Sequence, residues 1–141
     1  MRLDGRPGAS ACGLLDFQNA GLGPISYDLV SLLEDARRDV PTPLASAMLE
    51  HYLKSFPDLD REAFHRSYAV LGAVRHTRIV AVFVRLHLSH GKSEYLQHLP
   101  RVWRLLEAKL AEPVLAPVRD WFDRTLPPQV RAPLFHLKAI D

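Results

Sequence analysis

The segment Leu14-Leu15-Asp16-Phe17-Gln18-Asn19-Ala20 carries the residue types best suited to chemistry. An aspartate at the end of an apolar strand lies at a sheet edge, where its carboxylate can project into a cleft. Phosphoryl transfer uses such a group, because Mg²⁺ must bridge the nucleotide phosphates and takes oxygen ligands. An aspartate in this position is also a common turn or cap residue, so Asp16 alone leaves both interpretations open.

Three arginines form a second candidate site. Arg75, Arg78 and Arg85 fall within about 80° of one another on a helical wheel, in a stretch that is otherwise apolar. A planar guanidinium suits the carboxylate or hydroxyl groups of a ligand, so we interpret this stripe as substrate-binding. The alternative is ion pairing with acidic residues of neighbouring helices, namely Glu34, Asp35 or Glu94.

The histidines predict no zinc site. His76 and His87 are about three helical turns apart, which is too far to share a metal ion. His87 and His90 have a possible spacing, but no cysteine or carboxylate completes a ligand set. We assign the remaining conspicuous side chains to the core, with Cys12 as a buried thiol without redox duty, and with Trp103, Trp121, Leu106 and Phe122 as packing residues.

A small β-hairpin and a set of helices must position these candidates. Two short strands, over residues 1–3 and 12–17, are predicted on either side of a segment rich in turn formers. Apolar spacing, caps and prolines then predict helices over 25–39 with Ser26 as N-cap, 43–55 with Thr42 as cap, 60–88, 93–111 with a break or tilt at Pro100, and 113–125.

The predicted 60–88 helix is expected at the centre of the domain. From Ala69 onward it is apolar almost all the way round, which is typical of a buried helix. Its β-branched run over 79–84 could form a strand, but the helical period of the flanking residues favours a helix. The fold class is therefore α+β and mostly α: a short N-terminal hairpin followed by about five helices over 1–125, with a proline-rich irregular tail over 126–141.

The overall composition is that of an ordinary globular domain. Among the 141 residues, 48% are hydrophobic and 24% are charged, and the formal net charge is +2. Charge this balanced does not favour nucleic-acid or anionic-membrane binding. The single cysteine excludes an internal disulfide and fits the reducing cytoplasm, where we expect the protein to act.

The motif around Asp16 resembles a known family. Residues 15–20, Gly23-Pro24 and the run over 27–33 are similar to the aminoglycoside phosphotransferase-like (choline kinase-like) kinases. Within that family the chain most resembles the bacterial cell-wall sugar kinases that phosphorylate N-acetylmuramate and N-acetylglucosamine at the anomeric position. Segments 75–79, 83–86 and 99–103 are similar to the same group, so the resemblance covers nearly the whole chain and weakens after about Thr125.

This resemblance implies the C-terminal lobe of a protein-kinase-like fold, in an enzyme that uses ATP and Mg²⁺ to phosphorylate a sugar. Asp16 would be the metal-binding aspartate, and Asp28 would support the catalytic loop through hydrogen bonds. Without the family, Asp28 is equally well interpreted as a charge favoured by the helix dipole. Asn19 departs from the pattern, since near relatives usually carry aspartate there, and this change alters the local electrostatics.

Three parts of such a kinase have no counterpart in the sequence: a nucleotide lobe with its lysine, a His-x-Asp catalytic loop, and the asparagine of the second metal position. The chain is thus expected to contain no catalytic base, to be inactive alone, and to self-associate through exposed apolar surface. ATP and a sugar acceptor, such as a cell-wall amino sugar or an aminoglycoside, are the expected partners of the complete enzyme. A non-catalytic helical module that binds a ligand or partner is the alternative, which the apolar hairpin residues Leu3, Leu14, Leu15 and Phe17 disfavour.

Overall fold

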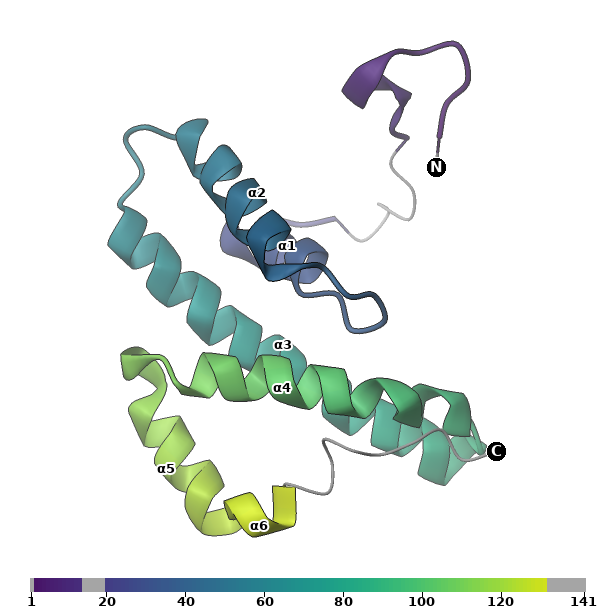
Figure 1. Cartoon of the computed structure of the whole chain (residues 1–141), viewed down its shortest axis with the longest axis vertical. Helices are drawn as coiled ribbons and strands as arrows, with labels where there is room; N and C mark the ends of the chain where they lie inside the picture. Colours follow the sequence, from purple (N-terminus) through teal and green to yellow (C-terminus); the bar gives the residue numbers. More distant parts are fainter. Residues whose placement is uncertain (1, 14–19, 132–141) are drawn as a thin grey trace.

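The computed structural model describes residues 2–13 and 20–131, and almost all of its regular structure is helical (Figure 1). In chain order the elements are the 3₁₀-helix η1 (Gly8–Ala11), the α-helices α1 (Ser26–Leu33), α2 (Thr42–Lys54) and α3 (Arg61–His90), η2 (Ser93–His98), α4 (Leu99–Leu110), η3 (Pro113–Leu115), α5 (Ala116–Thr125) and α6 (Pro128–Arg131). Within the described ranges, no helix is long and apolar enough to cross a membrane.

The N-terminal segment forms a loop closed by one β-bridge. Arg2 pairs with Cys12 in antiparallel fashion, and the Leu3 N–H donates to the Ala11 carbonyl at 2.7 Å. The ends of the predicted hairpin therefore meet, but residues 14–17 of its second strand lie outside the described ranges. The prediction of a buried thiol is wrong, because Cys12 is exposed. This segment lies away from α3, α4 and α5, so those helices do not cover it (Figure 1).

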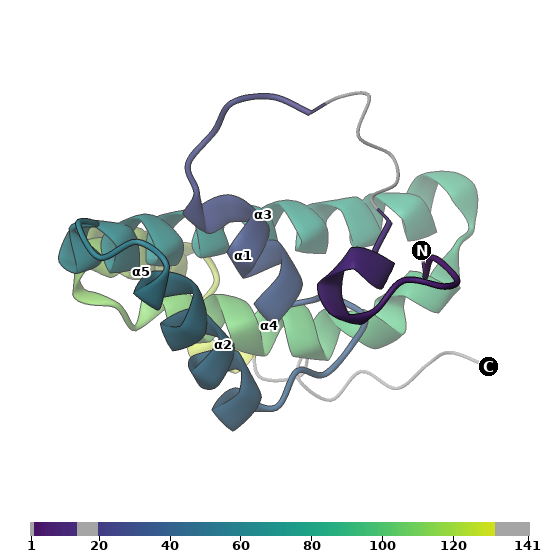
Figure 2. The ribbon, with the colours of Figure 1, turned by 90° about the horizontal axis from the view of Figure 1, so that it is seen from above.

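Helix α3 is the element around which the others pack. It begins after Asp60, whose side chain accepts from the Ala63 N–H at 2.9 Å, and it ends at Gly91, which has a φ of 65°. It contacts α1, α4, η2 and η3, and Figure 2 shows α3 and α4 running side by side. The predicted central helix is confirmed, including the run over 79–84. Its burial is narrower than predicted, because no described element covers the face that carries Val74 (59% exposed) and Leu88 (75% exposed).

Three apolar clusters connect the helices to α3. The first lies between α3, α4, η3 and α5, the second between α1, α2 and the start of α3, and the third between the end of α3, η2 and α4. Their buried members are Ala69, Ala73, Trp103, Leu106, Leu110, Leu115 and Phe122; Leu29, Val30, Leu33, Leu53, Phe64 and Tyr68; and Ala36, Phe83, Leu99 and Val102. Each large side chain that leaves water contributes roughly 2 kcal/mol to these clusters.

Helix α1 is shorter than predicted. It ends at Leu33, because the chain then turns so that Glu34 points inward and the Asp35 carboxylate accepts from the backbone N–H groups of Arg37 and Arg38. These bonds give the backbone an alternative to continued helix. The prediction of a helix reaching residue 39 is therefore wrong.

Two predicted N-caps are also wrong. Ser26 is the first residue of α1 and is buried, and its hydroxyl shares a 2.8 Å hydrogen bond with that of Ser67 in α3. The cap position belongs to Ile25. Thr42 is likewise inside α2, where Pro41 occupies the cap position without a side-chain hydrogen bond. The Ser26 hydroxyl therefore bonds to Ser67 of α3 instead of capping the backbone of α1.

The C-terminal elements pack as predicted with two differences. Pro100 stands in the first turn of α4, so the predicted break falls between η2 and α4. Trp103 is buried, but Trp121 is 51% exposed, so its assignment to the core is wrong; it lies on the open side of α5. The short helix α6 forms within the segment predicted to be irregular. Its Arg131 is only 4% exposed and pairs with Glu107 and Asp123.

A buried ionic cluster joins α1, α3 and α4. The Glu34 carboxylate accepts from His76 Nε2 at 2.7 Å and lies 2.5 Å from Lys109 Nζ. His76 is fully buried, and the Glu34 and Lys109 side chains are only 12% and 14% exposed. The Lys109 ammonium also lies 4.3 Å from the ring centroid of Tyr68. One carboxylate thus binds a nitrogen donor from each of two helices.

The lysine reaches this position only because residue 72 has no side chain. A Cβ on Gly72 would lie 2.8 Å from Cε and 3.1 Å from Cδ of Lys109. The lysine side chain cannot move away freely, because its ammonium is held by Glu34. Gly72 therefore serves packing, at the cost in helix propensity that glycine imposes.

We expect the Glu34–His76–Lys109 cluster to make the free energy of unfolding depend on pH in the acidic range. Burial raises the pKa of Glu34, but the hydrogen bond from His76 and the charge of Lys109 outweigh it, so the pKa lies below its ordinary value of 4.5. A carboxylate whose pKa is lower in the folded state than in the unfolded state stabilises the fold at pH values above its unfolded-state pKa. This stabilisation is lost as the pH falls through its folded-state pKa. The free energy of unfolding should thus decline below about pH 4.5, as measured by urea denaturation.

Glu34→Gln should remove much of this acid dependence and should cost about 3 kcal/mol at neutral pH, because Lys109 would stay buried without its counter-charge. The matched control is Glu112→Gln, which changes an exposed glutamate and should keep the wild-type pH profile. Identical pH profiles for wild type and Glu34→Gln would contradict the role given to this cluster.

We expect Gly72→Ala to destabilise the chain by about 1–3 kcal/mol, although alanine is the better helix former. The added methyl group must displace Lys109 and so weaken its contact with Glu34. Thr77→Ala, at an exposed position of the same helix, should change stability by less than about 0.5 kcal/mol. A double-mutant cycle with Lys109→Ala gives the decisive measurement: the penalty should largely vanish in that background, and an unchanged penalty would place its cause elsewhere.

Candidate functional site

The described part of the candidate site begins just after the Asp16 motif. Asp16 itself lies outside the described residues, as does Asn19. The chain is described again from Ala20, through the loop of Gly21 to Pro24, and into α1. The site is therefore built from α1 and the helices that hold it.

Both ends of α1 are anchored to α3. The Ser26–Ser67 hydrogen bond holds its first turn, and Glu34, immediately after its last turn, binds His76 of α3 and Lys109 of α4. Between these anchors Leu29, Val30 and Leu33 are buried in the cluster shared with α2 and α3. The outward-facing residues of α1 thus stand on a helix that has little freedom to shift.

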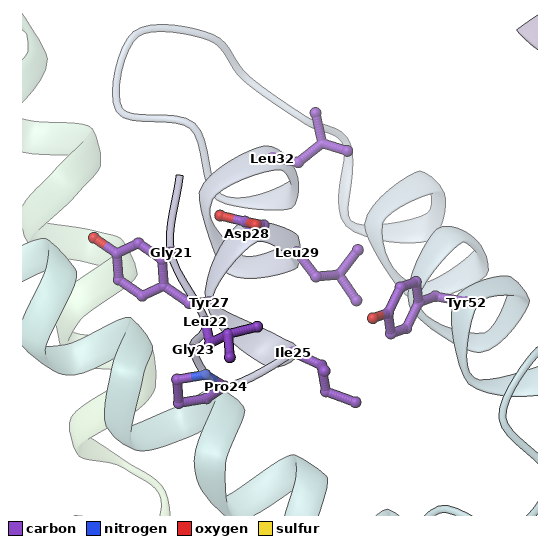
Figure 3. Close-up of a pocket in the computed structure, with 10 residues that line it drawn as sticks. All are labelled: Gly21, Leu22, Gly23, Pro24, Ile25, Tyr27, Asp28, Leu29, Leu32 and Tyr52. Atoms are coloured by element: carbon purple, nitrogen blue, oxygen red, sulfur yellow. The ribbon is translucent and has the colours of Figure 1, made fainter. Parts of the chain in front are cut away.

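Asp28 stands on the outward side of α1, at an open pocket of about 650 Å³. The loop before α1, four residues of α1 (Tyr27, Asp28, Leu29 and Leu32) and Tyr52 of α2 line this pocket, and Figure 3 shows Leu29 pointing toward Tyr52. Asp28 is exposed and makes no hydrogen bond or ion pair with any described residue. Three apolar side chains lie exposed around it: Leu22, Ile25 and Leu32.

The structure brings two of the three predicted arginines together. Arg75 and Arg78 line a second pocket of about 260 Å³, together with Tyr27 of α1 and the apolar Ile79, Val82 and Phe83 of α3. Arg85 is exposed, and it does not line this pocket. The stripe predicted from the helical wheel is therefore divided, because three residues that share an azimuth are still spread over nearly three turns of helix.

The alternative of ion pairing for these arginines does not hold within the described part of the chain, where none of the three forms an ion pair. Glu34 is bound to His76 and Lys109, and Asp35 accepts from backbone N–H groups. The Nε of Arg75 is buried without a hydrogen-bond partner. The two guanidinium groups of the pocket therefore remain available to a ligand.

The arrangement is suited to binding and positioning. The described residues contain no group of three or more His, Cys, Asp or Glu side chains that could hold a metal ion. They do place a free carboxylate, Asp28, and a pair of free guanidinium groups on two sides of Tyr27, which lines both pockets. These groups can orient a polar ligand or an adjoining loop.

Sequence reasoning missed Tyr27 and the Glu34–His76–Lys109 cluster. Tyr27 is adjacent to Asp28 in the sequence, but nothing in its spacing indicated that it borders the arginine pocket. His76 offered a weak signal, since a polar side chain inside an apolar helical run needs a buried partner. The partners are 42 and 33 residues away in the sequence, which local periodicity does not reveal.

Comparison with known proteins confirms the resemblance predicted from the Asp16 motif. Residues 3–65 match the model of the phosphotransferase enzyme family. The chain is 44% identical over 126 residues to an N-acetylmuramate/N-acetylglucosamine kinase of Caulobacter vibrioides, which covers 89% of the chain and 35% of the relative. Proteins of the same name from Pseudomonas aeruginosa and Neisseria meningitidis are each 36% identical, over 70% and 72% of the chain and 31% and 30% of their own lengths.

The chain spans about a third of the length of these curated kinases. The similarity extends well past the family match, through α3 and α4, so it includes the helices that carry the arginine pocket and the buried ionic cluster. The chain is thus a homologue of these kinases, and its residues 3–65 match the phosphotransferase enzyme family.

Proposed function

We propose that the chain is the C-terminal, acceptor-binding part of an ATP- and Mg²⁺-dependent phosphotransferase that acts on an amino sugar. The observation that carries this proposal is the 44% identity over 89% of the chain to a protein named as an N-acetylmuramate/N-acetylglucosamine kinase. Since the chain corresponds to 35% of that relative, we place the nucleotide lobe and the catalytic base outside these 141 residues. ATP as donor places the reaction in the cytoplasm.

Asp16 is the residue that we propose as a ligand of Mg²⁺. A carboxylate oxygen is a ligand type that Mg²⁺ prefers, and the ion keeps waters and substrate phosphates as its other ligands. When bound, Mg²⁺ would neutralise the charge that develops on the transferred phosphoryl group. The contribution of this chain is one carboxylate, just before the anchored helix α1.

Asp28 is proposed to support the catalytic loop by accepting hydrogen bonds from it. Three observations support this role: its carboxylate is exposed, it has no partner among the described residues, and the pocket around it is rimmed by exposed Leu22 and Leu32. Exposed apolar surface around an unpartnered charge suits contact with further protein. In the isolated chain the same surface would favour self-association.

Arg75, Arg78 and Arg85 are proposed to contact the acceptor. The free guanidinium groups of Arg75 and Arg78 beside Tyr27 support this role, and Arg85 would act nearer the end of α3. The second candidate function is a non-catalytic module that binds a ligand or partner through the same pockets. Activity measurements on the complete protein distinguish the two.

We expect the purified 141-residue chain to transfer no phosphoryl group from ATP to N-acetylglucosamine or N-acetylmuramate, because one metal ligand without a base or phosphate clamp cannot position the reaction. A complete protein in which these residues are joined to a nucleotide lobe and a catalytic loop should transfer it. In that protein Asp16→Asn should lower kcat by about 10²-fold or more. Radiolabelled ATP and chromatography of the sugar phosphate provide the assay.

The matched control for this experiment is Asp58→Asn, which changes an exposed aspartate in the turn between α2 and α3. It should leave kcat unchanged. Transfer by the 141-residue chain at an enzyme-like rate would contradict its proposed inactivity. A complete protein that folds and binds sugar but never consumes ATP would favour the non-catalytic module.

We expect Asp28→Asn to separate folding from function. In the 141-residue chain, the substitution should change the free energy of unfolding by less than about 0.5 kcal/mol, because Asp28 is exposed. In the complete protein it should lower kcat about 10- to 100-fold, the loss expected for hydrogen bonds to a charged group that orients the loop. An unimpaired kcat would remove Asp28 from the proposed machinery.

A further inference from the structure

The pocket between α1 and α3 has the chemistry of an oxyanion site. Arg75 and Arg78 are one helical turn apart on α3, and both line the same space of about 260 Å³. Tyr27 of α1 lines the same pocket, and a tyrosine hydroxyl can donate a hydrogen bond. None of the residues that line this pocket is acidic.

The buried Nε of Arg75 strengthens this interpretation. It has no hydrogen-bond partner, although nearly all buried donors in folded proteins find one. The nearby carboxylates of Glu34 and Asp35 are already bound to other groups. An external oxyanion would therefore satisfy a donor that the described part of the chain leaves open.

The remaining wall of the pocket indicates which oxyanion fits. Ile79, Val82 and Phe83 line one side with apolar side chains, so the ligand should carry an apolar group next to its charge. A carboxylate on a short alkyl arm has this character, whereas a phosphate group exposes oxygens on all sides. Guanidinium groups bind planar carboxylates with two parallel hydrogen bonds, which adds geometric selectivity.

We propose that the Tyr27–Arg75–Arg78 pocket binds the carboxylate of an acidic amino sugar, such as the lactyl group by which N-acetylmuramate differs from N-acetylglucosamine. The identity of the sugar rests on the proposed function, but the preference for a carboxylate rests on the pocket alone. Tyr27 also lines the pocket around Asp28, so a sugar held by its carboxylate here lies beside the surface proposed for the catalytic loop.

Direct binding to the 141-residue chain tests this proposal without any phosphoryl transfer. The chain is titrated with N-acetylmuramate, N-acetylglucosamine, D-lactate and inorganic phosphate, and the arginine Nε–H resonances are followed by NMR. N-acetylmuramate and D-lactate should shift the Arg75 resonance. N-acetylglucosamine should bind at least about tenfold more weakly than N-acetylmuramate, because it cannot make the charge-assisted bonds.

Arg78→Gln is the informative variant, since Arg78 is exposed and its replacement should not disturb folding. It should weaken N-acetylmuramate binding about tenfold and leave any N-acetylglucosamine binding unchanged. Arg104→Gln, at an exposed arginine of α4 that forms no ion pair with any described residue, is the matched control and should bind like wild type. Circular dichroism confirms that each variant is folded.

Three results would overturn the proposal: equal binding of the two sugars, N-acetylmuramate binding that does not depend on Arg78, or no effect of N-acetylmuramate on the Arg75 resonance. Tighter, Arg78-dependent binding of phosphate than of D-lactate would also overturn it, by assigning the pocket to a phosphate group. The outcome is independent of the proposed function. An active complete protein whose pocket shows no carboxylate preference would contradict this inference alone, and a carboxylate-binding pocket in a protein that transfers nothing would contradict the proposed function alone.

Discussion

The contact of Glu34 with His76 and Lys109 is the interaction on which the arrangement of the helices depends. It places one negative charge between two helices that each contribute a basic group, in a region where the side chains are almost completely removed from water. Isolated, any of these groups would be costly to bury; together the Glu34 carboxylate, His76 Nε2 and Lys109 Nζ pair with one another and specify how α1 sits on α3 and α4. Apolar packing alone would tolerate a shift of one helix along another more readily than this cluster does.

This constraint reaches the candidate site through α1. The helix is only eight residues long, so an anchor at Glu34 and another at Ser26 leave little of it free. Tyr27 and Asp28 lie between these two anchors, so their backbone is held in place as well. The positions of the exposed Asp28 carboxylate and the half-buried Tyr27 phenol are thereby fixed by the bonds of Ser26 and Glu34, as in a rigid scaffold that supports a functional surface.

The two pockets beside α1 differ in the charge of the residues that line them. Around Asp28 the rim is apolar and the charge is negative, which suits contact with further protein. Across Tyr27 the charge is positive and the wall is apolar, which suits a small anionic ligand. In a phosphotransferase, positioning provides much of the catalysis, and the residues of this chain are of the positioning kind. The metal ligand proposed for the complete enzyme is Asp16, and its catalytic base is proposed to lie outside these residues.

The sequence by itself determined the features that depend on local periodicity and local motifs. The helical character of 79–84 and the break at Pro100 follow from spacing and proline, whose effects act within a few residues. The family follows from the motif around Asp16, since its residues are contiguous. The candidate residues Asp28, Arg75 and Arg78 could be named for the same reason, although their surroundings could not.

Only the tertiary structure decided what those residues contact. The end of α1 at Leu33, the use of the Ser26 hydroxyl, the exposure of Trp121 and the separation of Arg85 from Arg75 each depend on an element distant in the sequence. Helical spacing defines a face but not its partner, and a buried partner can outweigh a local cap or a continuing helical period. The Glu34 cluster shows the reason most clearly: its three members are far apart along the chain, and only the packing of three helices brings them within hydrogen-bonding distance.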